Sequence, residues 1–180
     1  MIKRDYDGKR GEGILKQFTK AVLYVYPLIK EMEQSYAEHI RNKAILSYKN
    51  TQSTEGLVRY VSKQICRRDK LLWLEDVLNG VMGGLGDIDK ALLQIRYFGK
   101  NRKNAQTDGA FKEIASWSAS KYFREQNKLE KRIENLLIRS GLTEQVFDEW
   151  FAPMQIFRLI NQYLQVGRDA YNKREKAFLG

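Results

Sequence analysis

Cysteine and histidine are scarce in this chain of 180 residues, which contains only Cys66 and His39 of these two types. A single cysteine excludes an internal disulfide framework and a cysteine-rich zinc site, and a single histidine excludes a histidine-rich metal site. No catalytic triad stands out. The sequence leaves a catalytic pair of carboxylates open, because the distance between two carboxylates depends on the fold. We therefore expect a protein without metal or cofactor that is not an enzyme, in a reducing, cytoplasmic compartment.

Long apolar runs and prolines are also rare. The longest run, Ala21 to Ile29, includes Pro27 and is far too short to span a bilayer. The N-terminus lacks the apolar core of a signal peptide, so we expect no membrane partner. The chain has only two prolines and shows no alternating segment bounded by turns. The sequence therefore predicts an all-α fold.

Acidic residues are outnumbered by basic ones, 22 to 32, which gives a net charge of +10. Such an excess favours a nucleic acid or an acidic surface over a neutral small molecule as the partner. The charge is uneven: residues 99–140 carry ten basic and five acidic side chains, whereas residues 141–180 carry five of each. Half of the net charge therefore lies in 42 residues of the chain.

Helical periodicity and polar breaks divide the chain into three regions. Residues 1–86 form an N-terminal region of long helices, residues 87–141 a helix-turn-helix-like central unit, and residues 142–180 a C-terminal helical pair. Asp87 is expected to cap the first helix of the central unit, and Thr143 the first helix of the C-terminal pair.

The N-terminal region is predicted to hold two long helices. The first runs from about Ile14 to Tyr48, and Pro27 should kink or split it because proline removes a backbone donor and clashes with the preceding turn. The second is expected to be capped by Thr54 and to continue to about Met82.

Residues 121–139 have the pattern of one helix with two opposed faces. The apolar stripe is expected to consist of Tyr122, Phe123, Leu129, Ile133, Leu136 and Leu137. The basic stripe consists of Lys121, Arg124, Lys128, Lys131, Arg132 and Arg139, with Glu125, Glu130 and Glu134 at its flanks. A nearly pure basic ridge suits a polyanion, and an ordinary amphipathic surface helix is the alternative.

Three consecutive elements lead into this helix. A packing helix ends in the aromatic pair of Leu92–Phe98, and the short Phe111–Ala115 follows after a loop. Ser118 or Ser120 then caps the basic helix. Ala115 is small enough to let two helices cross closely, which is the layout of a helix-turn-helix.

The order LL-IRYF, EIA and S-SKYFR resembles the region-four DNA-binding module of bacterial sigma factors. It is most similar to the sigma-like late transcription regulators of phages and mobile elements in Gram-positive bacteria. The resemblance covers about residues 88–139. It implies that Arg96 and Tyr97 close a support helix and that Glu113–Ala115 belongs to the first helix of the motif.

The first functional hypothesis is a sequence-specific DNA-binding transcription regulator. Double-stranded DNA is its expected partner, and RNA polymerase and a second copy of the chain are further candidates. The expected phosphate contacts are Lys100, Arg102 and Lys103. The expected groove contacts are Lys121, Arg124 and Lys128, and the basic face continues through Lys131 and Arg132.

The alternative is a helical adaptor or structural factor of a mobile element without DNA readout. It arises because the interval from Glu113 to the capping serine is short for the family and the usual turn glycine is missing. The two hypotheses differ on whether Lys121, Arg124 and Lys128 are exposed or are covered by the C-terminal helices.

Overall fold

The computed structural model describes residues 17–47, 53–98 and 109–166. Within these ranges the chain is helical and contains no β-strand, which confirms the all-α prediction. The helices are α1 (Gln17–Val25), η1 (Tyr26–Leu28), α2 (Ile29–Ser47), α3 (Thr54–Gly83), α4 (Asp87–Arg96), α5 (Gly109–Ala115), α6 (Ala119–Arg139) and α7 (Glu144–Trp150). A further helical segment spans residues 155–166.

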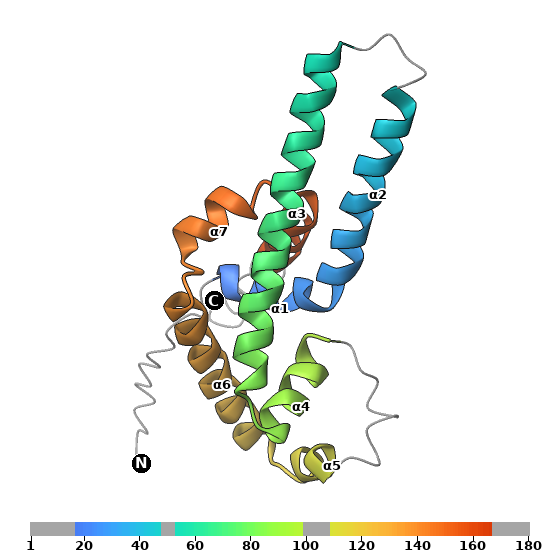
Figure 1. Ribbon diagram of the computed structural model, residues 1–180. Coiled ribbons are helices and arrows are strands. Elements are labelled where there is room, and N and C mark those ends of the chain that lie inside the picture. Colours follow the sequence, from blue (N-terminus) through green and yellow to red (C-terminus); the bar gives the residue numbers. More distant parts are fainter. Residues whose placement is uncertain (1–16, 48–52, 99–108, 167–180) are drawn as a thin grey trace, which may run out of the picture.

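Pro27 separates the first two helices, as predicted, because it lies in the 3-10 turn η1. After this turn, α2 and α3 run side by side as a long antiparallel hairpin that projects from the rest of the molecule (Figure 1). Ser53 caps α3 in place of Thr54, and its hydroxyl accepts a hydrogen bond from the amide of Gly56 at 3.2 Å. Ser53 has the extended backbone that a capping residue needs, whereas Thr54 is already helical.

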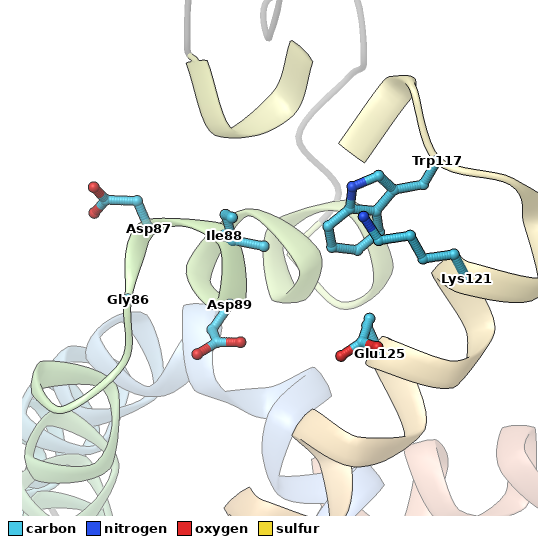
Figure 2. Close-up of a pocket in the computed structure, with 7 residues that line it drawn as sticks. All are labelled: Gly86, Asp87, Ile88, Asp89, Trp117, Lys121 and Glu125. Atoms are coloured by element: carbon cyan, nitrogen blue, oxygen red, sulfur yellow. The ribbon is translucent and has the colours of Figure 1, made fainter. Parts of the chain in front are cut away.

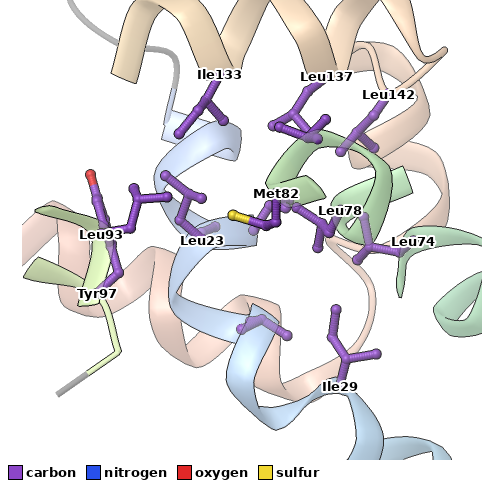
Figure 3. Close-up of a cluster of buried hydrophobic side chains, with 14 of the residues drawn as sticks. Leu23, Ile29, Leu74, Leu78, Met82, Leu93, Tyr97, Ile133, Leu137 and Leu142 are labelled. Carbon is purple, nitrogen blue, oxygen red and sulfur yellow. The ribbon is translucent and has the colours of Figure 1, made fainter. Parts of the chain in front are cut away.

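One hydrophobic core draws side chains from all three regions of the chain. Figure 3 shows Leu23 of α1, Leu78 of α3, Leu93 of α4, and Ile133 and Leu137 of α6 within it. All five are fully buried. Because α6 packs against both α3 and α1, these two helices fix the position of the basic helix.

Gly141 ends α6 with a left-handed backbone at φ 92°. The amide of Leu142 donates a hydrogen bond to the carbonyl of Leu137 at 2.9 Å, and the amide of Gly141 donates to that of Ile138 at 3.1 Å. This pair of bonds is a Schellman motif. Leu137 and Leu142 are both buried in the core, so an apolar contact accompanies the turn (Figure 3).

Candidate nucleic-acid interface

The basic helix α6 begins after a three-residue turn that follows α5. The hydroxyl of Ser118 accepts a hydrogen bond from the amide of Lys121 at 3.2 Å and caps the helix, whereas Ser120 lies in its first turn. The short helix α5 packs against α4. The order α4, α5, turn and α6 therefore has the connectivity of a helix-turn-helix.

The apolar face of α6 differs from the predicted stripe at Phe123, whose side chain is 56 % exposed. Leu129 and Ile133 are buried, as predicted, and Tyr122 packs half-buried against the core. Adjacent residues of a helix are rotated by roughly 100°, so Tyr122 and Phe123 cannot both face the line of Leu129 and Ile133. Placing Phe123 in the core was therefore wrong.

Glu130, expected at a flank, is buried and joins α6 to α4. Its Oε1 accepts a hydrogen bond from the hydroxyl of Tyr97 at 2.5 Å and another from Nε2 of Gln126 at 3.1 Å. The same oxygen forms an ion pair with Nε of Arg96 at 3.1 Å. Burial of the hydroxyl, together with the charge of Glu130, raises the pKa of Tyr97 far above its ordinary value. This network compensates for burying the Glu130 carboxylate, because each donor replaces a hydrogen bond that the carboxylate would otherwise accept from water.

Two of the predicted cations of α6 have partners within the central unit. Arg132 forms an ion pair with Asp89 in the first turn of α4. Nζ of Lys121 lies 4.3 Å from the centre of the Trp117 ring, a cation–π contact within the turn that precedes α6. The ion pair of Arg132 joins α6 to α4, whereas the contact of Lys121 joins α6 to the turn before it. Both cations therefore have a partner within the protein.

A pocket of about 590 Å³ lies on this side of α6. Figure 2 shows its lining residues, which are Gly86, Asp87, Ile88, Asp89, Trp117, Lys121 and Glu125. Gly86 occupies the N-cap of α4, where Asp87 was expected, and Asp87 is the first helical residue. Carboxylates in a first turn stabilise the helix dipole. Because three carboxylates line the pocket, this flank of α6 is unfavourable for a polyanion.

Arg124 and Lys128 remain accessible, each with 65 % of its side chain exposed. Both contact Oε1 of Glu125, through Nε at 3.2 Å and Nζ at 3.1 Å respectively. The hydrogen bonds from Lys128 and Arg124 lower the pKa of the Glu125 carboxyl. Exposed ion pairs of this kind contribute little stability, so an anion that binds more strongly can replace Glu125 as the partner of Arg124 or Lys128.

The outer face of α6 carries a continuous exposed line opposite the core. Ser120, Arg124, Asn127 and Lys131 are all exposed and follow one another at intervals of four, three and four residues. Such spacing places them on one side of a helix. The charge pattern of the sequence does not indicate Asn127, because the side chain is neutral, whereas its spacing of three residues from Arg124 does.

The three basic residues expected to contact phosphates, Lys100, Arg102 and Lys103, lie outside the described residues. Within the described residues, no group of three His, Cys, Asp or Glu side chains has the arrangement of metal ligands. No described helix combines the length and apolar character needed to cross a membrane.

Comparisons with protein-family models, with curated proteins and with solved structures find no match to this chain. The functional assignment therefore depends on the residues of α6 and their surroundings.

Proposed function

We propose that this protein is a sequence-specific DNA-binding transcription regulator that inserts α6 into the major groove of duplex DNA. The observation that carries the proposal is the exposure of Arg124 and Lys128 on a capped helix that follows a short helix and a turn. The C-terminal helices leave both side chains exposed, which favours a DNA-binding role over a purely internal packing role. The resemblance to sigma-like late regulators supports the same function.

The exposed line of α6 suggests a division of roles. Arg124 lies in the second turn, where recognition helices commonly meet base edges, and its guanidinium can bind guanine through two hydrogen bonds. Lys128 and Lys131 lie further along the helix and suit phosphate contacts. Arg132 is assigned to positioning α6 against α4 through Asp89, and Lys121 to positioning the turn before α6 through Trp117. Lys100, Arg102 and Lys103 remain proposed phosphate contacts.

The remaining parts of the proposal follow from this role. A chain that binds DNA in transcription control works where DNA is accessible, so we assign it to the cytoplasm of a bacterial cell. RNA polymerase and a second copy of the chain are the proposed protein partners. We assign no catalytic activity.

Fluorescence anisotropy tests this function. It measures binding of the protein to a labelled random duplex of about 20 base pairs at low salt. The variant Arg124→Ala/Lys128→Ala/Lys131→Ala should bind at least about ten-fold more weakly than the wild type, because phosphate contacts dominate affinity. The matched control Arg41→Ala/Arg59→Ala/Lys63→Ala removes the same charge from exposed positions on the hairpin. Equal losses for the two variants, or no binding by the wild type, would contradict the proposal.

A second candidate function, the adaptor, is favoured by the hairpin. The hairpin projects from the rest of the molecule (Figure 1). Near its free end, 53 %, 52 % and 57 % of the surfaces of Ile45, Leu46 and Val58 are exposed. Exposed apolar side chains on a projecting arm suit a protein contact. Absence of duplex binding, together with self-association that Val58→Asp abolishes in sedimentation, would favour the adaptor over the regulator.

A further inference from the structure

We propose that α6 recognises a thymine through Phe123 and an adenine through Asn127. This inference rests on the proposed function, because it names the bases that the exposed face of α6 would read. It predicts that the preferred duplex contains A·T pairs at neighbouring positions, in addition to any guanine bound by Arg124.

The first observation is the position of Phe123 at the edge of the exposed line. The side chain is 56 % exposed, and its ring meets the ring of Tyr122 edge-on, with the centroids 5.4 Å apart. Tyr122 is half-buried against the core, so its ring is a fixed support for Phe123, and more than half of Phe123 stays exposed. A supported, exposed apolar group can contact the 5-methyl group of thymine in the major groove.

The second observation is the position of Asn127 one helical turn beyond Phe123. Its side chain is exposed and lies beside Arg124 on the outer face of α6. A carboxamide can bind N6 and N7 of adenine together, which discriminates adenine from the other bases. One turn of a helix spans about 5.4 Å and successive base pairs are about 3.4 Å apart, so the two side chains reach bases one or two steps apart.

The third observation is the distribution of carboxylates around α6. Asp87, Asp89 and Glu125 all line the pocket on the flank that carries Lys121. On the helix circumference, Phe123 and Asn127 lie on the other side of Ser120 from that flank. Approach of DNA from this side keeps its phosphates away from the pocket carboxylates, and it brings Phe123 and Asn127 toward the bases.

The test begins with selection of the preferred duplex from a random pool by the full chain. Each thymine of that duplex is then replaced singly by uracil, which removes only the 5-methyl group. At one position the wild type should lose about four-fold in affinity, the effect expected for one buried methyl group. Phe123→Ala should bind the thymine and uracil forms equally. Phe123→Leu keeps an apolar contact and should retain part of the discrimination.

Asn127 is tested in the same duplex. Asn127→Ala should lose roughly five- to hundred-fold discrimination at one A·T pair within two steps of the sensitive thymine. Ile138→Ala, a partly exposed apolar residue near the other end of α6, is the matched control and should select the same sequence as the wild type. Circular dichroism of each variant separates a loss of readout from a loss of helix.

The outcomes distinguish this inference from the proposed function. If the wild type binds no duplex, both are wrong. If it binds and selects a sequence, but every uracil duplex binds equally well and Phe123→Ala keeps the same preference, only this inference is overturned. If Phe123→Ala instead abolishes self-association in sedimentation without changing DNA preference, Phe123 belongs to a protein contact and the inference is likewise overturned.

Discussion

The hydroxyl of Tyr97 donates a hydrogen bond to Oε1 of Glu130 at 2.5 Å, and this bond joins the end of α4 to the middle of α6. Both residues are buried, with 6 % and 4 % of their surfaces exposed. The bond spans 33 positions of the sequence. The orientation of the basic helix therefore depends on a buried polar network as well as on apolar packing.

Removing the hydroxyl in Tyr97→Phe should lower the free energy of unfolding by about 1–3 kcal/mol. The substitution keeps the ring but leaves a buried carboxylate with one donor fewer, and a hydrogen bond to a charged group is worth about that amount. Urea unfolding followed by circular dichroism measures the change. Tyr163→Phe is the control. Tyr163 is 72 % exposed, so loss of its hydroxyl should change stability little. Similar effects of the two substitutions would show that the bond to Glu130 is not stabilising.

Stability should also fall at alkaline pH, partly through Tyr97. Its pKa is raised by burial and by Glu130, so the folded protein keeps a proton that the unfolded chain releases above about pH 10. The unfolded state then binds fewer protons, and the free energy of unfolding falls by about 1.4 kcal/mol per pH unit for this tyrosine. Below about pH 10 its contribution is fully present.

The alkaline prediction is measured by urea unfolding of the wild type and of Tyr97→Phe at several pH values between about 9 and 11.5. The wild type should lose stability more steeply above pH 10, and the difference between the two slopes cancels the effects of other titrating groups. Parallel curves would mean that the folded state ionises Tyr97 as readily as the unfolded chain does.

Substitutions on the two faces of α6 should separate its buried and exposed apolar residues. Leu129→Ala should cost about 2–5 kcal/mol, because the side chain is only 2 % exposed and its loss leaves a cavity. Phe123→Ala removes a larger side chain but should change stability by less than about 1 kcal/mol, since that side chain is 56 % exposed. Thermal or urea unfolding of the pair checks this, and a larger loss for Phe123→Ala would reverse the assignment of the faces.

The fold could be predicted largely because its signals are local. Apolar periodicity indicates helices, and Pro27, Ser118 and Gly141 act within a few residues of their own position in the chain. The errors at Thr54 and Asp87 are shifts of one residue, because the neighbouring Ser53 and Gly86 have the extended backbone of an N-cap. Adjacent capping candidates cannot be ranked without the backbone.

The site could be predicted only in part, because its remaining features depend on distant segments. The sequence indicated that α6 is basic, and Arg124 and Lys128 are exposed. Burial of Glu130 depends on Tyr97, and the engagement of Arg132 depends on Asp89, 43 positions away. A charged residue at the edge of a helical stripe can face solvent or a partner helix, and periodicity alone does not distinguish the two.

Two glycine-to-alanine substitutions should have opposite effects. Gly141 has a φ of 92°, and a side chain in this left-handed region costs about 1–2 kcal/mol, so Gly141→Ala should destabilise the protein. Gly80 lies within α3 with nothing within 4 Å of an added Cβ, so Gly80→Ala should stabilise by about 0.5–1 kcal/mol. Thermal unfolding measures both. A destabilising Gly80→Ala would contradict the prediction for α3, and a neutral or stabilising Gly141→Ala would contradict the Schellman assignment at Gly141.

Arg124 and Lys131 should separate base recognition from phosphate binding. If the interface neutralises about five phosphates, log K of the wild type should fall with log salt at a slope of about −4 to −5. Lys131→Ala should weaken binding to all sequences alike and reduce the magnitude of that slope by about one. Arg124→Ala should instead relax the preference at one base pair, worth about 1–3 kcal/mol of discrimination. Each substitution removes one positive charge from the same helix face, so their bulk electrostatic effects are matched. Equal losses on every sequence would reduce α6 to a basic surface that holds DNA without reading it.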